Sequence, residues 1–197
     1  MNATQEARTR LRDGNARFAA GENPQPLSEG RRAELAEGQS PFAVVLSCSD
    51  SRVAPELLFD QALGDLFTVR VAGNLAAPTQ IASIEFAVES FGCPLVLVLG
   101  HTNCGTVIAT LDAMDSSVSP ESMACLINEI RPAADSITKD SPDRINLVAE
   151  AHTRATVAKL LSTSSALRTR VESGDLEVQG ALYSLATGEV AFFDEMA

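Results

Sequence analysis

The sequence predicts an α/β fold with a mainly parallel central β-sheet, an antiparallel C-terminal strand and flanking helices. Aliphatic runs at 42–47, 66–71 and 95–99 alternate along the chain with segments of helical periodicity, which is the pattern of a parallel sheet covered by helices. The strand-like segments 176–183 and 190–193 come last. The turn Thr187-Gly188 separates them, so we expect them to lie side by side in opposite directions.

Helix boundaries follow from capping and breaking residues. Helices are predicted over residues 4–20, 28–37, 54–61, 78–91, 105–113, 121–131, 141–161 and 165–172. Ser28 is expected to cap the second of these, and Gly92 to end the fourth. Pro132 is expected to stop the helix before it, and Ser141-Pro142 to open the next one.

The length and composition of the chain predict one domain. The 197 residues are 45% hydrophobic, which is enough to bury a sizeable core, and no linker divides them. We expect a single domain over 1–197, with an N-terminal helical arm at 1–40 and an α/β core at 41–197. Leu11 and Phe18 share an apolar stripe on the first helix, so we expect this helix to pack on a partner subunit.

The charge of the chain argues against two classes of partner. With 15 Lys and Arg against 26 Asp and Glu, the net charge of −11 repels both nucleic acid and anionic membranes. No apolar run approaches the ~20 residues needed to span a bilayer, and the first residues do not resemble a signal peptide. Four cysteines are too few for a disulfide scaffold. We therefore expect a cytoplasmic protein with reduced thiols.

Two polar clusters each begin just past the end of a predicted strand. Cys48 follows the first aliphatic run, and His101 and Cys104 follow the third. Neighbouring parallel strands end at the same edge of a sheet, so the three side chains are expected to converge there. Two thiolates and one imidazole make a zinc site with one position left for water or substrate, which is the catalytic arrangement. The sequence thus predicts one Zn²⁺ per chain.

Asp50 and Arg52 lie close enough to Cys48 to decide the state of this site. Asp50 could be a fourth zinc ligand, which would leave no room for a nucleophile. Alternatively, Asp50 pairs with Arg52, and zinc keeps a water whose pKa falls from 15.7 toward about 7. Because the two thiolates already neutralise the dication, an ionised Asp50 that orients this water would be needed. We expect the open state at neutral and alkaline pH.

These motifs together resemble the β-class carbonic anhydrases. The resemblance rests on Cys48-x-Asp50-x-Arg52 and His101-x-x-Cys104-Gly105, with Gly38-Gln39 and Arg70-x-Ala72-Gly73-Asn74 as further matches. It extends from Asn15-Ala16-Arg17-Phe18 to Gly180-Ala181-Leu182-Tyr183, essentially the whole chain.

The resemblance implies reversible hydration of CO₂ to bicarbonate and a proton by zinc-bound hydroxide. Cys48, His101 and Cys104 would hold the zinc, and Asp50 and Arg52 would be catalytic. It also implies a homodimer or homotetramer whose active site lies at the subunit interface. By motif position, the residues that bind CO₂ and bicarbonate would be Gln39, Phe67, Phe86 and Gly105.

Part of the family regulates its zinc through a separate bicarbonate site built around a Trp and an Arg. This chain has Arg70, but Val45 stands where that Trp is expected, and the sequence contains no Trp. We therefore expect no bicarbonate switch of this kind. Cys93 and Cys125 are expected to be buried, and His152 is expected on a polar, solvated part of its helix.

Three other functions remain open from the residues. The same zinc site could hydrolyse COS or CS₂, because related sequences with these ligands process such linear molecules. Cys48 could act as a nucleophile with His101 as its base, although Cys104 would then have no role. A zinc-stabilised binding protein without catalysis is the third, and Asp50 and Arg52 argue against it.

Overall fold

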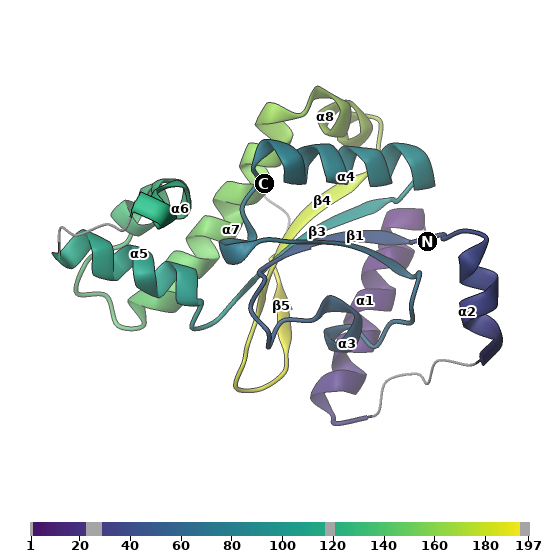
Figure 1. Cartoon of the computed structure of the whole chain (residues 1–197), viewed down its shortest axis with the longest axis horizontal. Helices are drawn as coiled ribbons and strands as arrows, with labels where there is room; N and C mark the ends of the chain where they lie inside the picture. Colours follow the sequence, from purple (N-terminus) through teal and green to yellow (C-terminus); the bar gives the residue numbers. More distant parts are fainter. Residues whose placement is uncertain (1, 23–28, 117–120, 194–197) are drawn as a thin grey trace.

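The computed structural model describes residues 2–22, 29–116 and 121–193 (Figure 1). The sheet contains β1 (Ala43–Ser47), β2 (Leu66–Arg70), β3 (Leu95–His101), β4 (Glu177–Tyr183) and β5 (Val190–Phe192). The helices are α1 (Ala3–Ala19), α2 (Glu29–Ala36), α3 (Pro55–Leu58), α4 (Pro78–Phe91), α5 (Gly105–Ser116), α6 (Ala124–Ser136), α7 (Arg144–Thr163) and α8 (Ser165–Glu172). Two 3₁₀ turns, η1 (Ala72–Asn74) and η2 (Glu121–Met123), complete the list. The predicted cap at Ser28 lies outside the described residues.

The strand order is β2-β1-β3-β4-β5, and only the last pair is antiparallel. The predicted mainly parallel sheet with an antiparallel C-terminal strand is therefore confirmed. The central strands β1 and β3 are buried at every position, because helices cover both faces of the sheet. In β1, Val44 and Leu46 pack toward α4 and α7, whereas Val45 packs toward α1 and α3.

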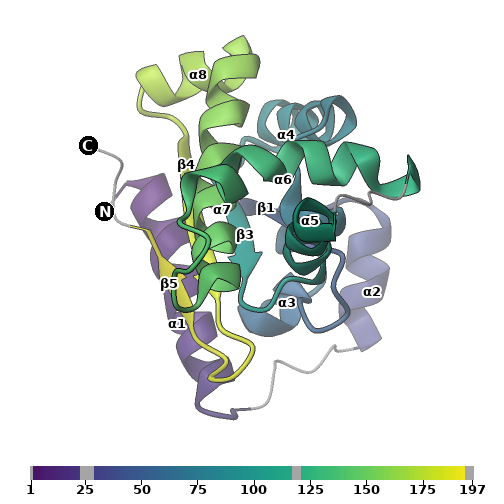
Figure 2. The ribbon, with the colours of Figure 1, turned by 90° about the vertical axis from the view of Figure 1, so that its left-hand side faces the viewer.

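A third layer lies at the carboxyl ends of the strands. Figure 2 views the molecule from the end that carries α5 and α6, which pack on each other and on α7. The side chains of Cys48 and Cys104 belong to the apolar cluster in this region, together with Ile130 and Val148. This layer covers the sheet edge where the sequence predicted the metal site.

Packing in this layer overturns three local predictions. Pro132 does not stop a helix but lies inside α6, because the buried face around Ile130 outweighs the ~3 kcal/mol cost of an internal proline. The next helix begins at Arg144, after Asp143 in the left-handed region (φ 60°), rather than at Ser141-Pro142. Cys125 is exposed, because the buried face of α6 turns toward α5 and α7.

Two further predictions concern buried polar and cysteine side chains. His152 was expected on a solvated helix face, but it is only 3% exposed, because α7 is packed between the sheet and α6. The expected burial of Cys93 is confirmed; its thiol donates to the carbonyl of Pro41, and burial raises its pKa to about 11.

The N-terminal helix α1 packs on its own chain. Leu11 is fully buried in the cluster that contains Val45 and Phe59, and Phe18 packs against the same cluster. Asn15 donates to the carbonyls of Leu58 and Gly188. The apolar stripe that the sequence assigned to a partner is thus covered within one chain.

Candidate metal centre and active site

Three metal-binding side chains meet at the carboxyl edge of the sheet. Cys48 follows β1, His101 is the last residue of β3, and Cys104 directly precedes α5. The parallel pairing of Ser47 with Leu99 brings the two strand ends together. The two Sγ atoms and a ring nitrogen of His101 lie within 4.8 Å of one another, and all three residues are buried. The structure therefore brings together the predicted donor set.

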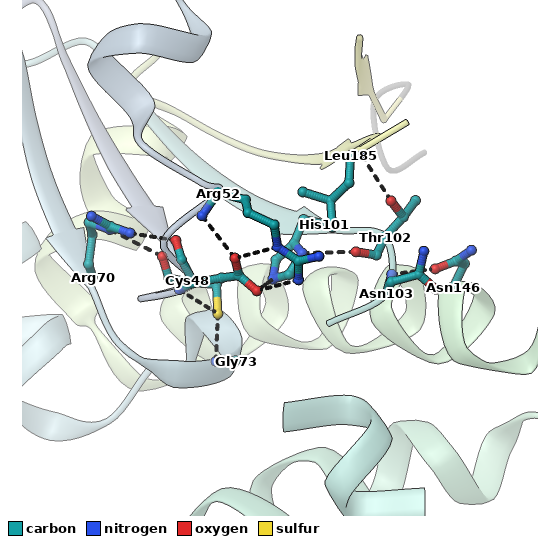
Figure 3. A network of polar contacts seen from close by, with 10 residues as sticks. Cys48, Arg52, Arg70, Gly73, His101, Thr102, Asn103, Asn146 and Leu185 are labelled. Atoms are coloured by element: carbon teal, nitrogen blue, oxygen red, sulfur yellow. Dashed lines mark hydrogen bonds and ion pairs between the residues drawn. The ribbon is translucent and has the colours of Figure 1, made fainter. Parts of the chain in front are cut away.

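The imidazole of His101 is oriented for metal binding. Its Nδ1 lies 2.9 Å from the carbonyl of Thr102, which can only accept, so Nδ1 carries the proton. Nε2 then has a free lone pair, and it has no hydrogen-bond partner among the described residues although it is buried. Thr102 is itself fixed, because its hydroxyl accepts from the backbone N–H of Leu185 (Figure 3). An unsatisfied buried nitrogen beside two thiols fits a zinc ion.

The two thiols differ in acidity. The Sγ of Cys48 accepts from the backbone N–H groups of Asp50 (3.4 Å) and Gly73 (3.3 Å), as Figure 3 shows for Gly73. A hydrogen bond from Cys104 contributes most to lowering the pKa of Cys48 to about 4, against the effect of burial. The hydrogen bond to Cys48 and burial raise the pKa of Cys104 above its usual range. A dication would compensate both thiolate charges at once.

Asp50 is held beside the donors by Arg52. The guanidinium donates from Nε to Oδ1 (2.9 Å) and from Nη2 to Oδ2 (2.7 Å), and the backbone N–H of Arg52 also donates to Oδ1 (2.9 Å). These bonds hold the pKa of Asp50 well below its usual range, so the carboxylate is ionised. Its Oδ2 lies 4.0 Å from Nε2 of His101. Of the two states considered for Asp50, the structure has the one paired with arginine.

Arg70 has a structural task at this edge. Its guanidinium donates to the backbone carbonyls of Cys48 (3.2 Å) and Asp50 (2.7 Å), as seen in Figure 3 for Cys48. These bonds fix the loop that presents the first cysteine and the aspartate.

The predicted substrate residues are divided by the fold. Gly105 begins α5 next to Cys104 and lies at the site. Phe67 instead pairs with Val44, four residues before Cys48, which places it about 13 Å back along the strands. Its ring contacts Phe86 at a centroid distance of 6.2 Å, and Phe86 is 54% exposed. Gln39 is also exposed, just before β1. Within one chain, these three residues do not join the metal centre.

Sequence reasoning missed the residues that hold the metal loops. Thr102 fixes the ring of His101, and Asn146 on α7 accepts from the backbone N–H of Asn103 at 2.8 Å. His152 contacts the carbonyl of Gly73, whose backbone N–H donates to the sulfur of Cys48. The left-handed backbone of Asn103 (φ 51°) has a signal in the sequence, since Asn tolerates this conformation, but the contacts from α7 have none.

The fold and the site together define a metal-dependent α/β enzyme. Residues 43–190 match the carbonic anhydrase family. Carbonic anhydrase of Mycolicibacterium smegmatis is 42% identical over 183 residues, covering 91% of this chain and 88% of that protein. Carbonic anhydrase 2 of Mycobacterium tuberculosis is 39% identical over 188 residues, covering 94% and 91%.

Solved structures agree with the sequence relatives. One of two tetrameric β-carbonic anhydrases from Sordaria macrospora superposes with a TM-score of 0.72 at 25% identity, covering 83% of this chain and 86% of that chain. The chain belongs to the β-class carbonic anhydrase family, and its activity is the reversible hydration of CO₂. Within the described residues, no helix is both long and apolar enough to cross a membrane.

Proposed function

We propose that Cys48, His101 and Cys104 hold one zinc ion, beside which this chain hydrates CO₂ to bicarbonate and a proton. The observation that carries the proposal is the unpartnered Nε2 of His101, facing two thiols in a buried site. Bound zinc supplies the Lewis acidity that makes water a nucleophile near neutral pH. The protein residues must then orient that water, hold the substrate and keep the fourth position free.

Asp50 is suited to orient the attacking water. Its carboxylate is ionised and lies next to the donors, so it can accept a hydrogen bond from the water and direct a lone pair toward the carbon of CO₂. Arg52 occupies both carboxylate oxygens and so keeps Asp50 away from the metal. We expect a crystal structure at pH 8.5 to show Asp50 paired with Arg52; an Asp50–zinc bond would contradict this.

We further propose that the CO₂ pocket is completed by a second copy of the chain. Gln39, Phe67 and Phe86 are remote from the metal of their own chain, so a partner's metal centre is where they can serve. An apolar slot with one amide group for orientation suits a small apolar gas. The half-exposed ring of Phe86 would be covered in such an assembly, and the Sordaria macrospora relatives are tetrameric.

In this assembly, two chains could exchange their N-terminal arms at 1–40, so that each arm packs on the partner. The face of α1 centred on Leu11 covers this chain, and the same face would fit the identical surface of a partner. Sedimentation together with activity over a dilution series tests the assembly. We expect activity per chain to fall as monomers form, and a fully active monomer would contradict a shared site. The free thiols agree with the cytoplasm that we propose as the location.

Stopped-flow CO₂ hydration, measured with the zinc content of the same preparation, tests the function. We expect one zinc per chain and hydration that disappears when zinc is removed and returns when it is restored. Release of H₂S from COS by this preparation measures the alternative activity. Faster turnover of COS than of CO₂ would overturn the proposal.

A further inference from the structure

Gly73 is a weak point in the support of Cys48. Its backbone N–H donates to the cysteine sulfur, and its φ of 72° lies in the left-handed region. A Cβ at this position would lie 3.1 Å from Ile130 and 3.3 Å from Thr106, so both the backbone and the space favour glycine. Glycine is also the residue whose backbone turns most freely. The direction of this N–H therefore needs support from outside its own turn.

His152 supplies that support from α7. Its Nε2 lies 2.8 Å from the carbonyl of Gly73, and because the carbonyl only accepts, Nε2 carries the proton and donates. The side chain is 3% exposed, and its Nδ1 has no partner among the described residues. A buried histidine with one unsatisfied nitrogen is costly, so its single hydrogen bond has a specific task. Fixing the carbonyl of Gly73 fixes the turn that aims its N–H at the sulfur of Cys48.

Asn146, on the same helix, holds the loop that carries His101 and Cys104. Its Oδ1 accepts from the backbone N–H of Asn103, between His101 and Cys104. Its Nδ2 donates to Asp143 at 2.7 Å, which fixes the orientation of the amide. Asn103 has a φ of 51°, so this loop too has a left-handed residue held by a side chain of α7 (Figure 3).

We propose that α7 is a clamp that sets the geometry of the zinc site through His152 and Asn146. His152 holds Gly73, whose N–H donates to Cys48 from the turn after β2, and Asn146 holds Asn103 in the loop that carries His101 and Cys104. Both are positioning residues that act through backbone atoms and touch no metal or substrate. This inference rests on the proposed zinc site. We expect that loss of either side chain weakens zinc binding. Mutation of residues that support metal ligands typically lowers metal affinity by about 10- to 100-fold.

The test compares three variants of the clamp with one control. His152→Leu removes the donor, whereas His152→Gln places an amide N–H near the position of Nε2. Asn146→Ala removes the second contact at a half-buried position, where less packing is lost than at the buried His152. Thr156→Val is the control, because this buried threonine lies one turn beyond His152 and its hydroxyl donates to the backbone carbonyl of His152, within α7, rather than to a loop of the metal site.

Two readouts follow the metal rather than catalysis. They are the rate of zinc release to a chromophoric chelator and the thiolate-to-cobalt absorption band of the Co²⁺-substituted protein. We expect His152→Leu to release zinc about 10- to 100-fold faster and to shift the band. Asn146→Ala should release zinc faster to a smaller extent. His152→Gln and Thr156→Val should stay near the wild type.

The outcomes separate this inference from the proposed function. Wild-type protein without zinc would overturn the proposed function. If the wild type holds zinc, release at the wild-type rate by His152→Leu and Asn146→Ala would overturn the clamp. Equally faster zinc release from His152→Gln, His152→Leu and Thr156→Val would also overturn the clamp, because it would show that any substitution in α7 destabilises the site. If His152→Leu does not fold, Asn146→Ala alone decides. Zinc release at the wild-type rate and an unshifted cobalt band in this variant would overturn the clamp.

Discussion

The metal loops and the aromatic cluster of Phe67, Phe86 and Phe91 differ in how complete they are. At the metal loops, all three donors, the Asp50–Arg52 pair and the supporting contacts come from one chain. The aromatic cluster lies further back along the sheet with Phe86 half exposed, and it reaches no metal donor of its own chain. The donor set for the proposed metal is therefore complete within one chain, whereas the substrate pocket that we propose needs the assembly.

Loss of one metal ligand gives the largest expected effect. Cys104→Ser should lose stoichiometric zinc, and CO₂ hydration should fall to the uncatalysed rate, because two of the three thiol and imidazole donors remain and the nearby Asp50 is held by Arg52. Metal analysis and stopped-flow hydration measure both. Cys93→Ser is the matched control, since Cys93 is equally buried but donates to Pro41 away from the site. Retained zinc in Cys104→Ser would contradict the assigned donors.

Asp50→Asn should separate catalysis from metal binding. The amide keeps the size of the side chain but loses the charge that Arg52 stabilises. We expect the zinc content to stay unchanged and kcat to fall by about 10- to 100-fold. Hydration at the wild-type rate would instead favour a zinc protein in which Asp50 has no catalytic role.

Substitution of Gln39 tests the other half of the comparison. Gln39→Ala should retain zinc and lose about tenfold in kcat/KM, the effect of one lost hydrogen bond to a substrate oxygen. Its circular dichroism and melting temperature should match those of the wild type, because the side chain is exposed.

Co-expression of the Gln39→Ala and Cys104→Ser chains sharpens this test. If Gln39 serves the partner's metal, each mixed dimer has one intact site. About a quarter of all sites are then intact, and activity rises to about a quarter of the wild-type value. If Gln39 serves its own chain, the mixture cannot exceed half of the rate of Gln39→Ala. Such a low rate would remove the shared pocket from the account.

The smallest expected effect is the pH dependence of stability from His152. Burial lowers its pKa, and Lys159 on α7 adds to this, whereas the bond to Gly73 and Glu129 on α6 oppose it. The pKa of His152 in the folded protein lies below its unfolded value of 6.5. The contribution of His152 to folding stability is therefore complete above pH 6.5 and is lost as the pH falls through the folded pKa.

Urea unfolding of the wild type and His152→Gln from about pH 7.5 to about pH 5 measures this contribution. The wild type should lose stability relative to the variant on acidification. Parallel curves would show that burial of this histidine has no effect on stability over that range.

The strand ends and the metal donors could be predicted from the sequence because their signals are local. An aliphatic run of strand length marks each parallel strand, and the residue after it marks the sheet edge, so Cys48 and His101 could be placed together. The pair Asp50 and Arg52 is likewise close in sequence, and the predicted ion pair is present.

The layer of α5, α6 and α7 could not be predicted in the same way. Pro132 stays within α6, and His152 is buried, because of contacts between helices that are distant in sequence. The same contacts place α7 against the loop of His101 and Cys104 and against Gly73, which donates to Cys48. Local capping and polarity rules therefore failed where tertiary packing outweighs them, and this is also where the metal site obtains its support.

Anomalous X-ray scattering at the zinc edge locates the metal and its donors in one experiment. We expect one peak per chain, at about 2.3 Å from both Sγ atoms and about 2.0 to 2.1 Å from Nε2 of His101, with all three donors from the same chain. A site without a peak, a bond between the sulfurs of Cys48 and Cys104, or a ligand donated by a second chain would contradict this expectation.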